Sequence, residues 1–203
     1  MPVVATPTNY RLPWYVRLLF WNQRRRYGAV LEPARLWGRT PKVFMALALL
    51  YGALDRRSSP IEPALRSLVT VRVSQINWCP FCVDINSAMV LRRGVDQAKL
   101  SELASFGTSE LFSEREKAAL AYAEAMTYSD SNPTDEHLTK LRRHFDDDAI
   151  IELTGLIAFQ NLSSKFNAAL SVEAQGFCTV NPPPANRGQH RARASTNARA
   201  SER

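Results

Sequence analysis

Cysteine and histidine are scarce in this chain, which has three of each among its 203 residues. A structural zinc site usually takes four such ligands, arranged as two closely spaced pairs. Only Cys79 and Cys82 form a pair of that kind. The other possible ligands are scattered along the chain: Cys178, His137, His144 and His190. We therefore expect no metal and no other cofactor, although half of a zinc site stays open as an alternative for the pair.

Long apolar runs are absent as well. A membrane-spanning helix needs about 20 consecutive, mostly apolar residues. The longest candidate, residues 43–54, is too short and is followed by Arg56 and Arg57. The first five residues lack the basic start and apolar stretch of a secretion signal. We therefore expect a cytoplasmic protein without a membrane partner, where two closely spaced cysteines are more often catalytic or metal-binding than structural.

The alternation of apolar and polar residues that marks a β-strand is nearly absent, and Leu68–Val73 is the one weak candidate. Apolar residues instead recur at helical spacing. We expect helices over residues 14–27, 32–37, 41–54, 61–76, 79–93, 97–104, 114–128, 135–144 and 149–170. Thr40 should cap the third of these, and Ser113 with Glu116 forms a capping box before the seventh. The sequence therefore predicts an all-α, multi-helix bundle.

Acidic residues are rare at both ends of the chain. Residues 1–60 have a net charge of +8, residues 61–180 have −5, and residues 181–203 have +4. Basic ends can contact acidic partners without defining a function. No aromatic residue lies among the arginines of the last segment, and no recognition motif is present, so we expect no nucleic-acid partner.

These patterns divide the chain into three parts. We expect a basic helical extension over residues 1–39, a helical domain over residues 40–176, and a disordered tail rich in Arg and Pro over residues 177–203. The first helix has an aromatic side and ends in three arginines, so a membrane surface is one possible partner for it. We expect it instead to pack on the bundle or on another subunit.

The cysteine pair has the strongest chemical signal in the sequence. Residues three apart on a helix share a face, so Cys79 and Cys82 can form a disulfide within one turn. Cys79 falls at the start of a helix, with Pro80 at the first helical position. Unpaired N–H groups and the helix dipole favour a thiolate there. A thiolate attacks peroxides and disulfides, and a neighbouring thiol then closes a disulfide.

Two further interpretations of the pair remain open beside the zinc half-site. Cys79 and Cys82 can be buried and inert, because free cysteine is among the most buried residue types. They can also be the remnant of a redox site that no longer turns over.

Three segments resemble the carboxymuconolactone decarboxylase and alkyl hydroperoxidase D-like family. The longest is Leu65–Leu91, which contains the sequence Asn-Trp-Cys-Pro-Phe-Cys; the others are Phe112–Ala118 and Ile157–Asn167. The resemblance covers about residues 40–175, and it implies an all-α fold and homo-oligomers. In the peroxidase branch it implies a dithiol that reduces hydroperoxides and is restored by a thiol reductant. Carried over to this chain, Cys82 would be the peroxidatic cysteine and Cys79 the resolving cysteine.

The chain departs from the peroxidase motif at two positions. The motif has a Glu twelve residues before the first cysteine and a His four residues after the second, where this chain has Ser67 and Asn86. Neither side chain titrates near neutral pH. Asn86 lies one turn beyond Cys82 and can orient a water or a substrate oxygen, and Arg72 is a further candidate to stabilise a thiolate.

Two functions follow from these residues. The first is a thiol-disulfide redox protein, peroxidase-like, that reduces a hydroperoxide or a disulfide through Cys79 and Cys82. The alternative is a non-catalytic or redox-sensing oligomeric binding module on the same scaffold, suggested by Ser67 and Asn86. The decarboxylase branch generally lacks the cysteine pair, which weighs against lactone decarboxylation.

Overall fold

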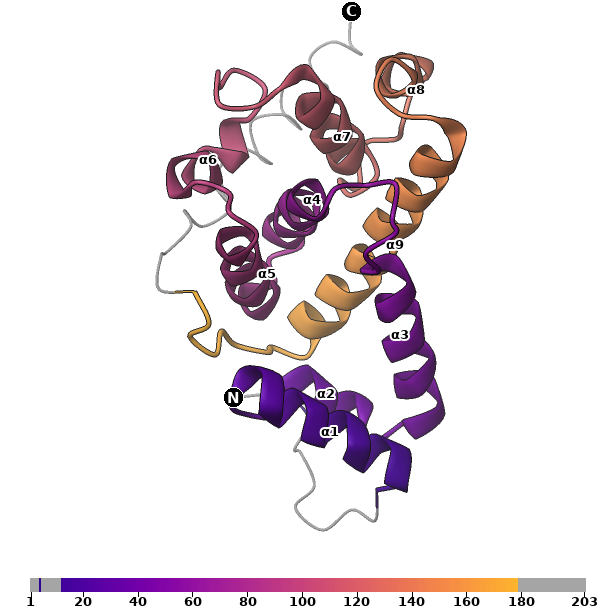
Figure 1. Ribbon diagram of the computed structural model, residues 1–203, viewed down its shortest axis with the longest axis vertical. Helices are drawn as coiled ribbons and strands as arrows, with labels where there is room; N and C mark the ends of the chain where they lie inside the picture. The colour runs from indigo at the N-terminus through magenta and orange to yellow at the C-terminus, as the bar shows by residue number, and fades with distance from the viewer. Residues whose placement is uncertain (1–3, 5–11, 179–203) are drawn as a thin grey trace, which may run out of the picture.

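The computed structural model describes residue 4 and residues 12–178, and its regular structure is helical throughout (Figure 1). The elements are α1 Trp14–Tyr27, α2 Glu32–Trp37, α3 Pro41–Leu54, α4 Pro63–Ile76, α5 Pro80–Arg92, α6 Gln97–Ser101, the 3-10 helix η1 Leu103–Ser105, α7 Glu114–Ala125, α8 Asp135–Arg142 and α9 Asp147–Ala169. No strand occurs among these described residues. The predicted all-α bundle is confirmed. None of these helices is long and apolar enough to cross a membrane.

Helix α4 is the centre of the bundle, where it contacts α5, α7 and α9. Eleven of its fourteen residues are buried. The possible strand Leu68–Val73 lies in the middle of this helix, so that interpretation was wrong. β-Branched residues favour strands when one face packs and the other is solvated. Here helices surround the segment, and burial on all sides outweighs its strand propensity, so the segment is helical.

Several helix ends follow the predicted capping chemistry, and others do not. Ser113 and Glu116 form the expected capping box of α7. Thr40 stands at the N-cap position of α3, but its hydroxyl donates to the carbonyl of Trp37 instead of accepting from the helix, so the predicted cap is wrong. Helix α4 begins at Pro63, later than expected, because Pro at the first helical position needs no hydrogen-bond acceptor.

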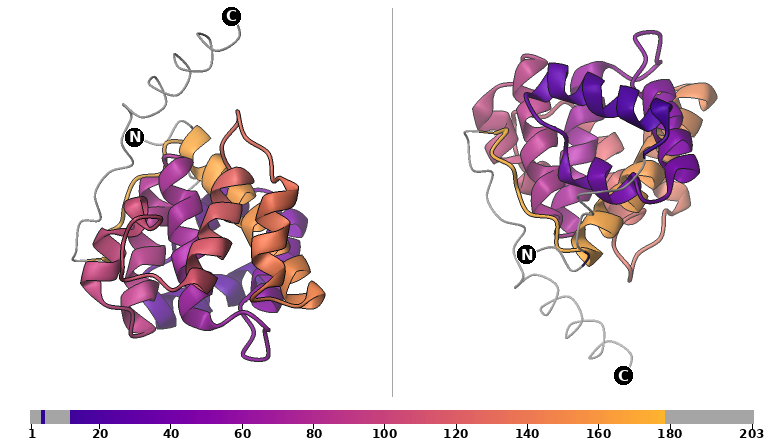
Figure 2. Two further views of the ribbon diagram at one scale, coloured as in Figure 1. Left: turned by 90° about the horizontal axis from the view of Figure 1, so that it is seen from above. Right: turned by 90° about the horizontal axis from the view of Figure 1, so that it is seen from below.

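Helices α1, α2 and α3 cross one end of the bundle, in front of α4, α5 and α9 in the right view of Figure 2. The inner face of α1 buries Val16, with Leu19 and Phe20 packed beside it. The opposite face leaves Trp14 and Trp21 largely exposed, at 75% and 53%. Packing of α1 on its own chain is therefore confirmed, while the division at residue 39 stays a prediction.

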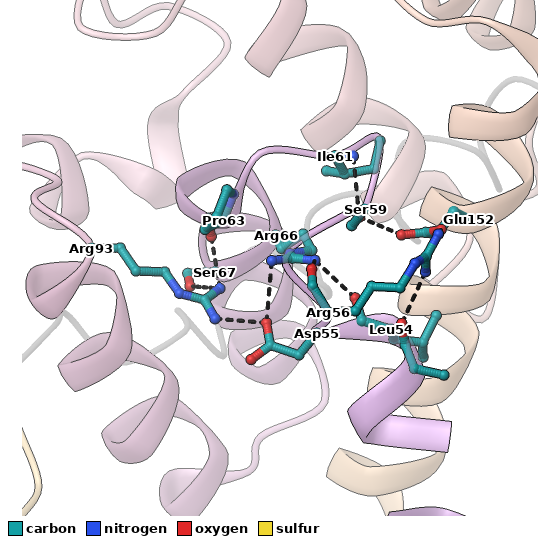
Figure 3. Close-up of polar contacts among 11 residues, drawn as sticks. Leu54, Asp55, Arg56, Ser59, Ile61, Pro63, Arg66, Ser67, Arg93 and Glu152 are labelled. Atoms are coloured by element: carbon teal, nitrogen blue, oxygen red, sulfur yellow. Dashed lines mark hydrogen bonds and ion pairs between the residues drawn. The ribbon is translucent and has the colours of Figure 1, made fainter. Parts of the chain in front are cut away.

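The buried Arg66 and the half-buried Arg93 join the end of α3 to α4 and α5 (Figure 3). The Asp55 carboxylate pairs with Arg93 at 2.6 Å and with Arg66 at 3.5 Å. Arg66 also donates to the carbonyl of Leu54 at 3.0 Å, and Arg93 to Ser67 Oγ at 2.9 Å. Burial lowers the pKa of Arg66, and the Asp55 carboxylate opposes that shift. This cluster therefore fixes where α3 lies over the bundle.

The segment after α9 returns across α5 (Figure 1) and is held by one carboxylate. Asp84 accepts backbone N–H bonds from Gln175 at 2.9 Å, Phe177 at 3.1 Å and Cys178 at 2.7 Å. Three such bonds satisfy a carboxylate that is only 7% exposed. The disordered tail expected over residues 177–203 lies, beyond Cys178, outside the described residues.

Candidate active site

The turn between α4 and α5 places the cysteine pair. The N–H of Cys79 donates to the carbonyl of Ser74 at 3.1 Å, the six-to-one bond that closes many helix C-termini. Trp78 occupies the left-handed position of this turn, with φ +54°, where glycine is usual. Cys79 therefore closes the C-terminal turn of α4 and is also the N-cap of α5, where Pro80 follows at the first helical position.

The two sulfurs are joined as a disulfide, and the Cα atoms are 5.2 Å apart. Both cysteines are buried, Cys79 at 0% and Cys82 at 2% exposure. The N–H of Cys82 donates to Cys79 Sγ at 3.1 Å, so an amide in the first turn of α5 points at that sulfur. Leu36 and Val172 complete the apolar cover. The helix start therefore supplies a hydrogen-bond donor to one sulfur of the pair.

Asn167 of α9 supplies a donor to the other sulfur. Its Nδ2 lies 3.2 Å from Cys82 Sγ, and the residue is 2% exposed. Its Oδ1 is also buried and has no hydrogen-bond partner in the described part of the chain. A buried, unpaired amide oxygen costs about 1–3 kcal/mol. The geometry thus leaves one strong acceptor beside Cys82 without a partner among the described residues.

A small network of uncharged groups extends the polar wall. Ser74 Oγ accepts hydrogen bonds from Gln160 Nε2 at 2.9 Å and from Asn86 Nδ2 at 3.3 Å. Ser74 itself donates to the carbonyl of Thr70. The predicted residue Asn86 therefore lies in a network of amides and hydroxyls, which do not titrate near neutral pH.

A cavity of about 480 Å³ lies between α1–α3 and the bundle. Cys82 lines it together with three amides, Asn86, Gln160 and Asn167. Much of the remaining wall is aromatic, from α1, α2, α3, α5 and α9: Tyr27, Trp37, Phe44, Tyr51, Phe81 and Phe159. Cys79 is not among the residues of this wall. The structure thus places one sulfur of the disulfide, and not the other, at the cavity.

Tyr51 brings a phenol to the same cavity. The residue as a whole is 42% exposed, but burial of its hydroxyl end raises the pKa of Tyr51 to about 12, and the Asp55 carboxylate adds to that shift. The phenol is therefore neutral across the pH range of most assays. Asp55 also lines the cavity and is neutralised by the arginines described above.

The other predicted site residues have partners elsewhere. Ser67 Oγ accepts from Arg93 at 2.9 Å in the cluster below α3. Arg72 pairs with Glu124, with Nε 2.7 Å from the carboxylate, and donates to Gln75 Oε1 at 3.1 Å. Of the five predicted residues, the structure brings together Cys79, Cys82 and Asn86 around one site. No group of three or more His, Cys, Asp or Glu side chains within the described residues is arranged to hold a metal ion.

The chain matches known proteins in sequence and in fold. Residues 41–125 match the model of the carboxymuconolactone decarboxylase family. The protein YnjA of Escherichia coli (strain K12) is 43% identical over 177 residues, which cover 87% of this chain and 97% of YnjA. This chain belongs to the carboxymuconolactone decarboxylase family. The resemblance found in the sequence is confirmed.

Two solved structures share the fold of this chain. One is a cysteine-to-alanine variant of the debrominase Bmp8 in complex with 2,3,4-tribromopyrrole, at 23% identity and a TM-score of 0.76, covering 87% of this chain and 95% of that one. The other is a peroxidase-related protein with an alkylhydroperoxidase AhpD core from Ralstonia eutropha JMP134, at 19% identity and a TM-score of 0.76, covering 87% and 94%. At these identities the likeness is one of fold.

Three residues that build the site were not predicted from the sequence. Asn167 and Gln160 lie 85 and 86 residues from their partners Cys82 and Ser74, and no local spacing connects them. The sequence gives no sign of the contact that Asp84 makes, yet its carboxylate anchors the segment after α9. The one available signal was Phe166-Asn167, which is typical of the family segment but does not indicate which residue Asn167 contacts.

Proposed function

We propose that this chain is a thiol-disulfide redox protein that reduces hydroperoxides through Cys79 and Cys82. The observation that carries the proposal is the position of Cys82: its sulfur belongs to the disulfide, lines the cavity and accepts a hydrogen bond from Asn167. A hydrogen bond to a sulfur stabilises the thiolate, which is the reactive form. The position of Cys82 supports its role as the peroxidatic cysteine.

The reaction uses both sulfurs of the reduced pair. The Cys82 thiolate attacks the terminal oxygen of the hydroperoxide; an S–O bond forms, the O–O bond breaks, and the leaving alkoxide takes a proton to become an alcohol. The Cys79 thiolate then attacks the sulfenic sulfur of Cys82, and the S–S bond forms as hydroxide leaves and is protonated to water. Two thiols are oxidised and one peroxide is reduced. An external thiol reductant then restores the pair by disulfide exchange.

Three features of the site support these roles. The amide at the start of α5 points at Cys79 Sγ and favours its thiolate for the second step. Asn86 lines the cavity one turn beyond Cys82 and positions polar groups of the substrate. Ser67 and Arg72 act at a distance, because their hydrogen bonds hold α4 against the end of α5 and against α7.

The test is peroxide-dependent oxidation of the reduced protein, followed by thiol counting. We expect two thiols to be lost per chain and both to return with dithiothreitol. Cys82→Ser should abolish the loss, and Cys79→Ser should leave a sulfenic acid on Cys82 that dimedone traps. Cys178→Ser is the matched control, because it removes a thiol outside the pair. Unchanged thiol counts in the wild type would rule out the proposal.

Turnover distinguishes the proposed enzyme from the redox-sensing alternative. An enzyme consumes many equivalents of peroxide when a thiol reductant is present, whereas a sensor is oxidised once and then stays oxidised. Continuous peroxide consumption with glutathione or thioredoxin as the reductant supports the enzyme. A single oxidation with no steady rate supports the sensing module.

The likeness to the debrominase structure suggests a second candidate reaction for the same dithiol. In reductive debromination a ring C–Br bond is replaced by C–H, bromide leaves, and the two thiols become a disulfide. The aromatic wall beside Cys82 favours a ring substrate of this kind. Bromide release from 2,3,4-tribromopyrrole by the reduced protein, absent in Cys82→Ser, would support it.

We also infer that the chain assembles with copies of itself in a reducing cytoplasm. Helix α1 exposes an apolar stripe of Trp14, Leu18 and Trp21, and large exposed apolar patches mark interaction sites. A dithiol that must return to its reduced form needs a compartment that supplies thiol reductants.

A further inference from the structure

The cavity beside Cys82 is far larger than hydrogen peroxide requires. Its volume of about 480 Å³ is roughly sixteen times the ~30 Å³ that one water occupies in the liquid. We propose that it binds the ring of an uncharged aromatic hydroperoxide and directs the hydroperoxyl group to Cys82 and Asn167. This inference rests on the proposed peroxidase function and names its substrate class.

The shape of the wall favours a ring over a short alkyl chain. Six aromatic side chains face the cavity, on five different helices. Two of them are already ordered by neighbours: the Trp37 ring stacks on Phe166 with centroids 3.8 Å apart, and Phe44 packs against Phe20. Rings held in place from several sides provide edge and face contacts to another ring at little entropic cost. A flat, apolar body is therefore the form that this wall accommodates best.

The polar end of the cavity matches a single hydroxyl donor. Asn167 Oδ1 is buried and unpartnered in the described chain, while Nδ2 of the same amide contacts Cys82 Sγ. A hydroperoxide has one O–H group, on the terminal oxygen that the thiolate attacks. When that O–H donates to Asn167 Oδ1, the amide brings the reacting oxygen to the side of the cavity where the sulfur lies.

The charges around the cavity favour a neutral substrate. Among the described residues of the wall the charged side chains are Arg26 and Asp55, which have opposite signs. Asp55 is paired with Arg93, and the amides Asn86 and Gln160 surround the reacting end. A cationic ligand would lose its hydration there without gaining an unpaired counter-charge, and the exposed Arg26 guanidinium lies over the Tyr27 ring, where solvent screens its charge.

Two small residues of α3 create the space for the ring. Ala48 and Gly52 are four residues apart on one face of this helix and both line the cavity. A Cβ placed on Gly52 would meet nothing within 4 Å. Larger side chains at these positions would extend into the cavity, whereas a substitution at the exposed Ala46 of the same helix would not, because Ala46 is not part of the wall.

The first experiment compares two oxidants on the reduced protein. We expect cumene hydroperoxide to form the disulfide about tenfold faster or more than hydrogen peroxide, since apolar pocket contacts of this size discriminate by that order. Ala48→Phe, and independently Gly52→Leu, should lower the rate of oxidation by cumene hydroperoxide about tenfold. The rate with hydrogen peroxide should stay within about threefold of the wild-type rate. Ala46→Phe is the matched control and should keep the preference. Equal rates for the two oxidants, or an equal loss in Ala46→Phe, would overturn the inference.

A second measurement needs no peroxidase activity. Iodoacetamide alkylation of Cys82 in the reduced protein, followed by peptide mass spectrometry, should be slowed by 2-phenylpropan-2-ol in the wild type and Ala46→Phe but not in Ala48→Phe. Protection without any peroxide oxidation would sustain ring binding and reject the proposed function. Peroxide oxidation without preference or protection would reject ring binding and leave the proposed function standing.

Discussion

At the scale of single residues, the hydrogen-bond donors around the cysteine pair are amides, and Asn86 stands where the peroxidase motif has a histidine. Asn167 donates to Cys82 Sγ, the N–H of Cys82 donates to Cys79 Sγ, and Asn86 donates to Ser74. Neither amide side chain gains or loses a proton near neutral pH. The dependence of peroxide oxidation on pH should therefore report the ionisation of the thiols alone.

Asn167→Asp tests the hydrogen bond to the Cys82 sulfur. A carboxylate in this position puts a negative charge beside Cys82, which raises the pKa of its thiol and lowers the thiolate fraction at neutral pH. We expect the oxidation rate at pH 7 to fall about tenfold or more and to recover as the pH rises. Thiolate absorbance at 240 nm against pH is the direct measurement. Asn167→Ala, which adds no charge, should show a smaller loss; equal losses would contradict the electrostatic explanation.

Asn86→His tests whether the missing base limits the rate. An imidazole one turn beyond Cys82 can accept the thiol proton, and general-base assistance is typically worth about 10²–10⁴-fold where the geometry is suitable. We expect a faster oxidation and a new limb in the pH–rate profile near the histidine pKa of about 6.5. Asn86→Gln keeps the amide and should show no new limb. A histidine variant whose profile overlays that of the wild type would show that proton transfer is not limiting.

At the scale of elements, the site is assembled from two long-range connections. The Asp55 cluster fixes α3 over the bundle and so shapes the cavity (Figure 3). The Asp84 carboxylate holds the segment after α9 against α5, where Phe177 packs on Phe81. Both connections use buried or half-buried carboxylates with several N–H donors, an arrangement that is strong when complete and costly when one partner is lost.

Asp84→Asn tests the second connection. The amide has one acceptor oxygen for three backbone N–H donors and turns an N–H of its own toward them, so at least one buried donor loses its partner. We expect the free energy of unfolding to fall by about 1–3 kcal/mol, measured by urea denaturation. The control is Asp96→Asn, which changes the N-cap of α6, where Asp96 accepts a single hydrogen bond from Ala98. Its effect on the free energy of unfolding should be only a few tenths of the effect of Asp84→Asn. Equal effects of the two substitutions would show that Asp84 stabilises the fold no more than an ordinary N-cap does.

At the scale of the whole molecule, the outer face of α1 has no cover within the described chain. Trp14, Leu18 and Trp21 recur at helical spacing and are 75%, 54% and 53% exposed. The opposite face of the same helix packs on α3. A helix that is apolar on both sides usually has a partner on each side. The inner partner is this chain, and we infer that the outer partner is a second copy.

The double variant Leu18→Ser, Trp21→Ser tests that interface. We expect it to shift the mass measured by light scattering or sedimentation toward the monomer, because two large apolar side chains would no longer be buried between copies. The control is Arg17→Ser, Arg24→Ser, which changes two exposed positions of the same helix outside the stripe. A wild type that is monomeric at micromolar concentration would contradict the inference directly.

Local patterns of residues predict the helices, most of their ends and the position of the cysteine pair at the start of one of them. Helical spacing, the Ser113 capping box and Pro80 after Cys79 are local features, and the interactions that they predict span only a few residues. The tertiary structure alone decided that Asn167 contacts Cys82, that α3 covers a cavity, and that Ser67 faces Arg93. These contacts join residues far apart in the chain, and they depend on how the helices pack, which no local pattern encodes.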